Sequence, residues 1–254
     1  MEVEYQKQDR IAIITLNRPE ARNAVNGALA RRMEEILDAY ESDPGLWVAI
    51  LTANGPAFCA GADLKEIAAG RGNELSTKKG GFAGLVKRER TKPLIAAVTG
   101  SALAGGTEIA LACDMIVCSN ETNFGLPEVK RSLVAGAGGL FRLPRVIGMA
   151  PALEVIMTGD PLTAERAYQL GMVNQVVPAG EVMQAAKALA ARVVAAAPTA
   201  VQQSRRVAIR AFNDDDDTLW RASSEAFAEV ARTEDYKEGP RAFIEKRAAQ
   251  WKGR

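Results

Sequence analysis

Short apolar runs alternate with amphipathic stretches along the first two thirds of the chain. The runs are rich in Val, Ile and Ala and are bounded by turn residues, which is typical of buried strands. Predicted strands lie at 10–17, 47–53, 93–100 and 115–119, with a short one at 172–178. Helical segments separate them, so the pattern predicts an α/β core.

Apolar residues at helical spacing mark the segments between these strands. They predict a helix that ends near the turn at 42–45, another over 102–114, and one with Thr163 as N-cap and Gly171 just past its end. From 181 onward the Ala-rich sequence predicts helices alone, broken at Pro198, 213–217 and 237–240. The C-terminal region is therefore expected to be helical.

Residues 69–92 show no regular spacing of apolar residues. The stretch is Gly-rich and charged, and we expect a mobile excursion from the core. Basic clusters such as 78–79 and 86–90 are most often solvated surface, which is the simpler interpretation here.

The amino-acid composition excludes several kinds of catalytic site and several classes of partner. The 254 residues carry a formal net charge of +1, which gives no reason to expect a nucleic-acid or membrane partner. The chain has no histidine, which excludes Ser-His-Asp triads, Cys-His pairs and a histidine base. Three cysteines without a CxxC pair predict buried thiols in a reducing cytoplasm rather than a disulfide or a metal site. The polar N-terminus lacks a signal-peptide core, and we expect a cytoplasmic protein.

Two predicted strand-to-helix turns share one design. Gly61-Ala62 and Gly105-Gly106 each lead from a strand toward a helix. The first amides of a helix have no internal partner and carry the positive end of the helix dipole. Small residues let a ligand oxygen approach the backbone closely. The amides of Ala62 and Gly105 are therefore candidates for an oxyanion hole.

Two glutamates are candidates for catalytic residues near these turns. Glu108 follows Gly105 by three residues, which places its side chain on the same face of the helix. Glu128 follows a turn proline among apolar residues. Two poorly solvated carboxylates can divide acid and base roles, because their surroundings push their pKa values apart.

Simpler interpretations of the same residues remain open. A Gly-Gly pair at a helix start often serves tight packing, and a glutamate near a helix N-terminus is often a dipole partner. The segment 100–106 is not a P-loop, because the GK[ST] ending is missing, and it lacks the GxGxxG fingerprint.

Six segments, taken together, resemble the enoyl-CoA hydratase/isomerase (crotonase) family in the same order along nearly the whole chain. They are "NRPEARNAVN", "AFCAGADLKE", "ALAGGTEIALACD", "FGLPEVKRSLVAGAGGLFRLPRVIG", "LTAERAYQLGMVNQVVP" and "AFIEKR". The resemblance implies a spiral of β-β-α units over 1–195. It also implies a helical oligomerisation region over 196–254, which builds a homotrimer or a hexamer.

The same resemblance implies an acyl-CoA thioester as substrate, no separate cofactor, and a role in fatty acid metabolism. It places the oxyanion-hole amides at Ala62 and Gly105 and the catalytic glutamates at Glu108 and Glu128. The CoA-binding residues that it implies are Arg22, Ala60 and Lys65, with Phe243 and Lys246 supplied by a neighbouring subunit. A surface role for Lys65 stays equally open.

The implied reaction adds water across the double bond of a trans-2-enoyl-CoA. We assign Glu108 as the base toward water and Glu128 as the acid toward the α-carbon, although coupled carboxylates blur that division. Residues 69–92 are expected to cover the acyl chain. The sequence reads AGGTEIA at 104–110, where hydratases commonly have GGGCELA, and this leaves the substrate open.

Other functions stay possible at this point. One group comprises related acyl-CoA enzymes: an enoyl-CoA isomerase, a crotonobetainyl-CoA hydratase-like enzyme, a thioester hydrolase or a decarboxylase. The other is a non-catalytic acyl-CoA- or RNA-binding member of the fold. Retention of both glutamates argues against the second group, and the near-neutral charge argues against its RNA-binding version.

Overall fold

Two β-sheets form the frame of the protein, and the computed structural model describes residues 1–254. The large sheet has six strands in the order β1 (Val3–Gln8), β2 (Ile11–Leu16), β3 (Val48–Ala53), β7 (Leu94–Val98), β9 (Met115–Ser119) and β12 (Gln175–Val177). The small sheet has four strands in the order β11 (Leu162–Thr163), β10 (Asn123–Gly125), β8 (Ser101–Leu103) and β4 (Ala57–Cys59). A separate hairpin pairs β5 (Ser76–Thr77) with β6 (Gly81–Phe82).

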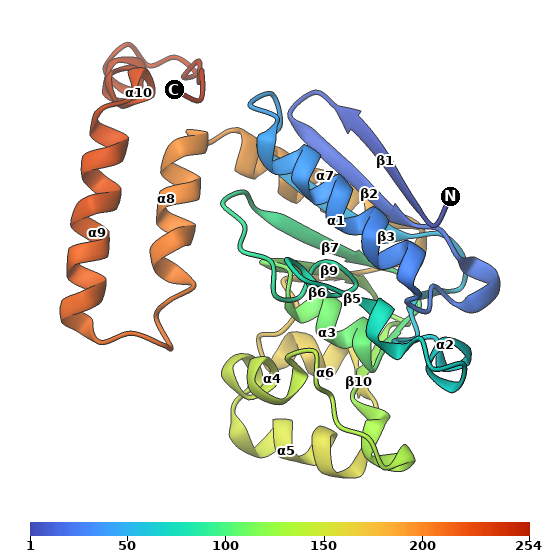
Figure 1. Cartoon of the computed structure of the whole chain (residues 1–254). Helices are drawn as coiled ribbons and strands as arrows, with labels where there is room; N and C mark the ends of the chain where they lie inside the picture. The colour runs from blue at the N-terminus through green and yellow to red at the C-terminus, as the bar shows by residue number, and fades with distance from the viewer.

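Ten α-helices and four 3-10 helices surround the sheets (Figure 1). The α-helices are α1 (Gly27–Ser42), α2 (Leu64–Ala68), α3 (Gly105–Leu111), α4 (Gly139–Ile147), α5 (Met149–Thr158), α6 (Ala164–Gln169), α7 (Val182–Val194), α8 (Pro198–Ala208), α9 (Asp216–Ala231) and α10 (Glu234–Ile244). The 3-10 helices are η1 (Pro19–Ala21), η2 (Gly72–Leu75), η3 (Pro127–Arg131) and η4 (Ala179–Glu181). None of the helices is both long and apolar enough to cross a membrane.

The chain winds as a spiral of β-β-α units. Strands β3, β7 and β9 lie side by side in the large sheet, and each is followed by a strand of the small sheet, β4, β8 or β10. A helix then follows, namely α2, α3 or η3. The central pairs are parallel in both sheets, so equivalent turns of successive units meet at the same edge. The α/β fold class and the spiral expected from the sequence are confirmed.

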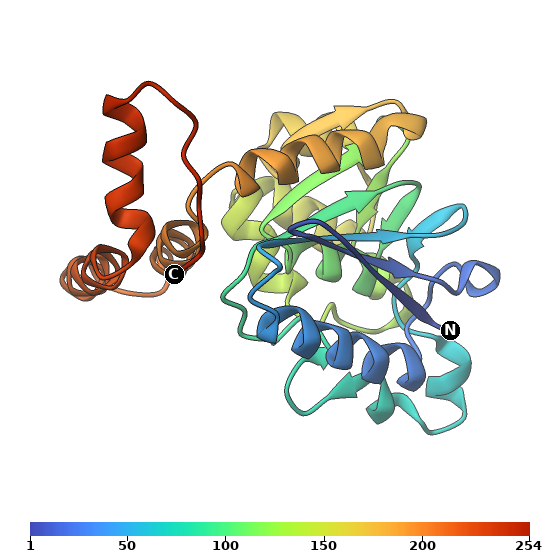
Figure 2. The same ribbon diagram turned by 90° about the horizontal axis from the view of Figure 1, so that it is seen from above.

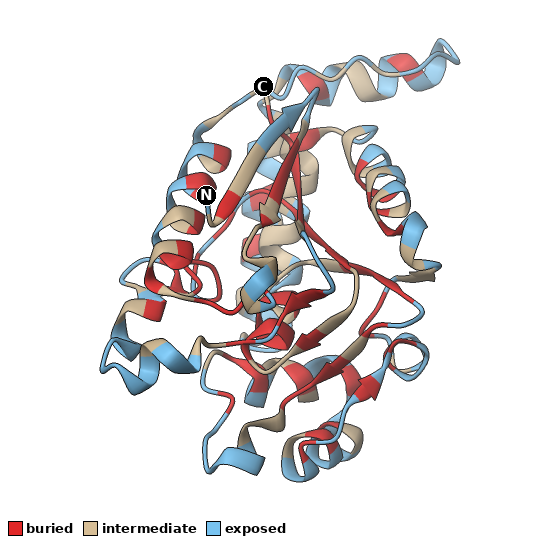
Figure 3. Cartoon of the chain, turned by 90° about the vertical axis from the view of Figure 1, so that its right-hand side faces the viewer, coloured by how far each residue is buried: buried red, intermediate tan, exposed pale blue.

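Alternating side chains of the large sheet build two cores on its two faces. On one face Val48, Ile50 and Ile95 pack with residues of α7. The other face belongs to the larger core, which includes Leu51 and the inner side of α1. The two helices lie on opposite sides of the sheet (Figure 2). Figure 3 shows the buried positions gathered in the strands and on the inward sides of the helices.

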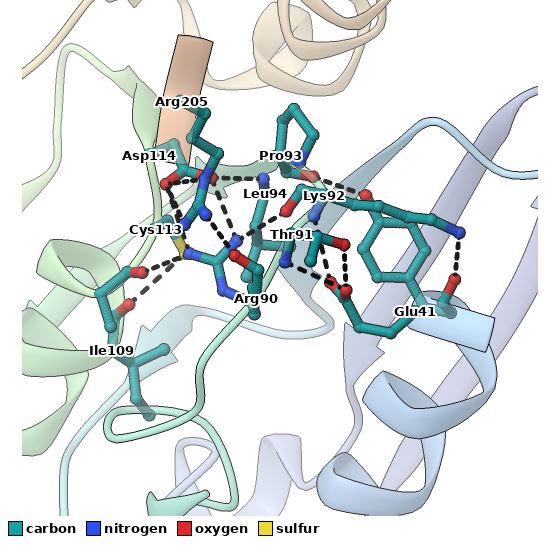
Figure 4. Close-up of polar contacts among 12 residues, drawn as sticks. Glu41, Arg90, Thr91, Lys92, Pro93, Leu94, Ile109, Cys113, Asp114 and Arg205 are labelled. Carbon is teal, nitrogen blue, oxygen red and sulfur yellow. Dashed lines mark hydrogen bonds and ion pairs between the residues drawn. The ribbon is translucent and has the colours of Figure 1, made fainter. Parts of the chain in front are cut away.

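The last three helices extend away from the sheets (Figure 1). These helices and the connection between α8 and α9 expose large apolar side chains: Ile209, Phe212, Trp220, Phe227, Tyr236, Phe243 and Ile244. An ion-pair cluster fastens the first of them, α8, to the core (Figure 4). The Asp114 carboxylate accepts hydrogen bonds from Arg90 (Nη1–Oδ2 3.0 Å) and from Arg205 of α8 (Nε–Oδ1 2.9 Å).

Several boundaries differ from those predicted. Residues 102–103 belong to β8 rather than to the helix over 102–114, because they pair with β10 and β4 in the small sheet. The polar segment 3–8 forms an edge strand that the sequence pattern did not predict. The predicted break at 237–240 is wrong, since Pro240 lies inside α10.

The segment 69–92 is more ordered than its sequence suggests. Arg88 is buried against Asp38, and the Lys92 ammonium donates to the Tyr40 carbonyl over 2.8 Å. Arg90 is buried in the Asp114 cluster. The prediction of a mobile excursion is therefore wrong for residues 86–92, because Arg88, Arg90 and Lys92 are bonded to the rest of the fold, while Lys87 is exposed.

Candidate active site

The turn from β8 into α3 leaves one backbone amide unused. Ala104 adopts a positive φ of 52°, a rare conformation for a residue with a side chain, and its amide donates to the Gly125 carbonyl over 2.9 Å. Gly105 is the first residue of α3, so its N–H has no acceptor within the helix, and no other group of the protein accepts from it. The first free amide expected from the sequence is therefore present.

A second unused amide belongs to Ala62, for a different reason than the sequence suggested. Helix α2 begins only at Leu64, so Ala62 does not lie in a helical turn. It forms an isolated parallel bridge with Val25, in which the Val25 amide donates to the Gly61 carbonyl over 2.7 Å. Successive groups of extended backbone point to opposite sides, so the Ala62 N–H faces away from Val25 and has no acceptor in the protein.

The two turns touch each other at Gly61. A Cβ atom added to this glycine would lie 2.8 Å from the Ala104 Cβ and 3.0 Å from the Gly105 nitrogen. Gly61 also has a φ of +93°, which favours glycine. Only a residue without a side chain lets the backbones of the two turns approach in this way. The structure thus brings the Ala62 and Gly105 turns together.

Glu108 is buried on α3, three residues after Gly105. Its side chain projects from the first turn of α3, and the residue is 3% exposed. The Gly139 amide donates to its Oε1 over 2.8 Å. Burial is the main cause that raises the pKa of Glu108 to about 7; the Gly139 amide opposes this shift, and the negative charge of Glu128 adds to it.

Glu128 lies in the first turn of η3, after Pro127, and is half-buried. Its Oε2 atom is buried and has no hydrogen-bond partner in the protein. Burial raises the pKa of this carboxyl, and the charge of Arg131 partly offsets the shift. An unpartnered carboxylate oxygen is costly to bury, so such groups are common where a ligand supplies the missing partner.

Phe82 is a site residue that the sequence analysis missed. A Cβ atom at Gly105 would lie 2.5 Å from the Phe82 Cε1, so the ring packs directly against the first residue of α3. Segment 69–92 therefore reaches the site through this side chain. The signal was available as a lone aromatic residue among glycines in "GGFAG", but nothing local to that sequence shows where the ring points.

Thr107 joins the segments that carry the two glutamates. Its hydroxyl lies 2.7 Å from the Ala102 carbonyl and 2.9 Å from the Gly125 carbonyl, and it accepts from the Gly125 amide over 2.9 Å. Gly125 is three residues before Glu128. The departure from the common hydratase pattern at 107 thus places a buried hydrogen-bonding group between α3 and β10.

We expect Thr107→Val to lower the free energy of unfolding by about 1–2 kcal/mol, because it leaves the buried Gly125 amide without an acceptor. Urea denaturation monitored by circular dichroism measures this change. Thr158→Val is the matched control, since the exposed Thr158 hydroxyl makes the same two kinds of bond, to the Glu154 carbonyl and from the Asp160 amide. Equal losses in both variants would contradict the special role of burial at Thr107.

The residues expected to bind CoA fall into two groups. Arg22 and Ala60 are neighbours, since the Ala60 amide donates to the Arg22 carbonyl over 3.0 Å, and Lys65 is exposed on the short helix α2. Phe243 is 85% exposed near the end of α10, and Lys246 follows it. Both belong to the helical extension, outside the β-β-α spiral (Figure 1). Their assignment to CoA stays a prediction.

The three cysteines are unpaired, with Cys59 and Cys118 buried and Cys113 half-buried. Burial raises the pKa of each thiol to about 12, so none is a thiolate at neutral pH. No group of three or more Cys, Asp or Glu side chains is arranged to hold a metal ion.

Comparison with known proteins shows which family this chain resembles. The family model for enoyl-CoA hydratase/isomerase matches residues 6–254. The chain is 40% identical over 250 residues to a short-chain-enoyl-CoA hydratase of Clostridium acetobutylicum, covering 95% of this chain and 94% of that protein. It is also 40% identical over 248 residues to a carnitinyl-CoA dehydratase of Proteus mirabilis, with the same shares covered.

A crystal structure of an enoyl-CoA hydratase from Mycobacterium tuberculosis H37Rv is similar over the whole length. The TM-score between the two structures is 0.96 and their sequences are 47% identical, with 100% of this chain and 99% of that one covered. The fold, the order of the motifs and the paired turns lead to one conclusion. The chain belongs to the enoyl-CoA hydratase/isomerase family.

Proposed function

We propose that this protein is an enoyl-CoA hydratase that adds water across the double bond of a trans-2-enoyl-CoA. The observation that carries the proposal is the meeting of two turns with unused amides, at Ala62 and Gly105, beside two carboxyls with raised pKa values. The named relatives with hydratase and dehydratase activity support the same reaction class.

In the proposed reaction, the two amides donate hydrogen bonds to the thioester oxygen of the substrate. Negative charge grows on that oxygen as the water oxygen bonds to the β-carbon, so the amides stabilise the transition state more than the bound substrate. One carboxylate takes a proton from the water, and the other carboxyl group gives a proton to the α-carbon. The product is a 3-hydroxyacyl-CoA, and the pair ends with the one proton it had at the start.

The acid and base roles are best assigned to the two glutamates as a coupled pair. Burial raises the pKa of both carboxyls, and it raises that of Glu108 to about 7, so Glu108 holds a proton in much of the free protein near neutral pH. The sequence-based assignment needs it on Glu128 when water adds. The charge of Glu128 adds to the rise in the Glu108 pKa, and the protons of two coupled carboxyls belong to the pair rather than to either residue. We therefore propose that one shared proton, rather than a fixed acid, is what the reaction requires.

This shared proton predicts the pH dependence. We expect kcat/KM to fall as the pH rises through about 7, where the pair loses its last proton, because the pKa of Glu108 is raised to about 7. It should fall again at lower pH, once Glu128 is protonated as well. Initial rates of crotonyl-CoA hydration across the pH range measure this profile. A kcat/KM that stays constant from about pH 5 to about pH 9 would contradict it.

A second candidate substrate is a carnitine-type acyl-CoA. The carnitinyl-CoA dehydratase of P. mirabilis matches this chain as well as the short-chain hydratase does, and both names describe addition or removal of water. The catalytic machinery proposed above serves both. The acyl chain is what differs, so a direct comparison of substrates decides between them.

A panel of thioesters tests the function. Crotonyl-CoA, a longer enoyl-CoA, crotonobetainyl-CoA, a 3-enoyl-CoA and a malonyl-type CoA are each incubated with the protein. Loss of the conjugated-thioester absorbance together with a mass gain of one water identifies hydration. An unchanged mass with a new conjugated absorbance indicates an isomerase, loss of carbon dioxide a decarboxylase, and free CoA a hydrolase. Tight binding without turnover of any member would contradict the proposal.

We also propose that the helical extension builds a homotrimer or a hexamer. The exposed apolar side chains of α9 and α10, such as Trp220 and Phe243, support this assembly. Phe243 and Lys246 would then reach the CoA of a neighbouring subunit, beside that subunit's own Arg22, Ala60 and Lys65. Analytical ultracentrifugation gives the subunit number, and a monomer at micromolar concentration would contradict the assembly.

A further inference from the structure

Arg142 lies between two loops that meet at the proposed site. The half-buried residue belongs to the first turn of α4. Its Nη1 atom donates to the Ala137 carbonyl over 3.1 Å, and its Nη2 atom donates to the Val86 carbonyl over 2.5 Å. A single guanidinium group thus connects residues that are about fifty positions apart in the sequence.

The first of these loops, which leads into α4, fixes the Glu108 carboxyl by a hydrogen bond. Gly139, two residues after Ala137, donates its amide to the Glu108 Oε1 over 2.8 Å. Gly138 has a φ of +110°, and a Cβ atom there would overlap the Arg142 Nη1. The path of the loop and the position of the guanidinium therefore depend on each other.

The second loop places Phe82 against the oxyanion turn. The Val86 amide donates to the Phe82 carbonyl over 3.3 Å, so both residues belong to one turn that begins at the last residue of β6. The Phe82 ring packs against Gly105, which supplies one of the two proposed oxyanion amides. Fixing the Val86 carbonyl consequently fixes the turn that carries this ring.

The charge of Arg142 also acts on Glu108. It opposes the rise in the Glu108 pKa that burial causes, and Glu128 has the opposite effect. Burial lowers the pKa of the Arg142 guanidinium and the charge of Glu108 opposes that shift, but an arginine keeps its proton at neutral pH. Its planar fork holds two acceptors in different directions at once, which a lysine ammonium on a flexible stem does much less well.

We propose that Arg142 is a positioning residue for the hydration step, because its guanidinium joins the loop that holds Glu108 to the turn that packs Phe82 on Gly105. This inference rests on the proposed function, in which Glu108 and the Gly105 amide act on the substrate. Arg142 itself contacts neither the thioester nor the water in this proposal. Arg142 keeps the Glu108 carboxyl and the Gly105 amide in fixed positions relative to each other.

The kcat and KM of variants at position 142 test whether this link between the two loops matters for hydration. We expect Arg142→Met to lower kcat for enoyl-CoA hydration by about tenfold to a hundredfold with KM changed much less, because small displacements of reacting groups are costly. Arg142→Lys keeps the charge but not the fork, and it should recover part of the loss. Arg145→Met is the matched control: Arg145 is exposed on the same helix, and its guanidinium lies 5.2 Å from the Phe141 ring centroid, as does that of Arg142.

A second readout does not depend on turnover. In protein labelled with ¹³C at glutamate carboxyls, the Glu108 signal is the one that Glu108→Gln removes. Its titration should move to higher pH in Arg142→Met and stay close to wild type in Arg142→Lys and Arg145→Met. If the wild type hydrates no enoyl-CoA, the proposed function fails while this titration still decides whether Arg142 acts on Glu108.

The two readouts also define failure. A kcat within twofold of wild type in Arg142→Met, with an unmoved Glu108 titration, would overturn the proposal. If Arg142→Met does not fold, Arg142→Lys decides: wild-type kcat in that variant would show that the fork between the two loops is not needed. A loss in Arg145→Met equal to that in Arg142→Met would assign the effect to the helix surface instead.

Discussion

Glu108→Gln and Glu128→Gln are each expected to hydrate crotonyl-CoA about a hundredfold to ten-thousandfold more slowly than the wild type. Glutamine has nearly the same shape as glutamate, and its amide oxygen can still accept the Gly139 N–H at position 108. It cannot take up or release a proton. The loss should therefore appear in kcat, while CoA binding stays nearly unchanged. Stopped-flow absorbance of the conjugated thioester, with calorimetric titration of CoA, measures both.

Glu121→Gln is the control for these two variants. Glu121 is exposed on the turn between β9 and β10, close in sequence to Glu128, and its replacement should leave the rate unchanged. Wild-type turnover by Glu108→Gln would remove that residue from the mechanism. Loss of CoA binding in either variant would mean that the glutamates hold the ligand rather than move a proton.

Glu108→Gln should also make the protein more stable at about pH 8, by up to about 3 kcal/mol. Burial raises the pKa of Glu108 from an ordinary value of 4.5 to about 7 in the folded protein, so the folded state binds a proton more readily than the unfolded state. The free energy of unfolding of the wild type therefore falls as the pH rises from about 4.5 to about 7. Glutamine carries no charge and avoids this loss.

The sign of the effect makes it testable. Urea denaturation at fixed protein concentration should show the gain of the variant at about pH 8 and its disappearance near pH 4, where the wild-type carboxyl is protonated in both states. A Glu108→Gln protein that is less stable than wild type at pH 8 would show that the ionised carboxylate stabilises the fold. One variant would thus lose activity and gain stability, as expected where a reaction needs a buried charge.

Local pattern was enough to predict five of the six strands of the large sheet, but none of the strands of the small sheet. Apolar runs predicted β2, β3, β7 and β9 closely, because a strand buried on both faces needs apolar residues at nearly every position. The half-buried edge strand β12 was predicted to within three residues. Capping chemistry marked Thr163, whose hydroxyl accepts from the Arg166 amide as predicted. The relation of Glu108 to Gly105 is also local, since three residues along one helix fix it.

The tertiary structure decided what the local pattern could not. Residues 102–103 extend a strand because β4 and β10 offer them hydrogen bonds, and the Ala62 amide is free because Val25 pairs with its neighbours. The pKa of Glu108 rises because distant segments exclude water from it.

The sequence by itself thus determined five strands of the large sheet, the helical C-terminal region, the family pattern and the residue types at the site. Only the tertiary structure decided that Phe82 packs on Gly105 and that Arg142 joins two loops. The physical reason is the range of the interactions. Hydrophobic period and capping act over a few residues, whereas burial and bridging contacts depend on segments that only the completed fold brings together.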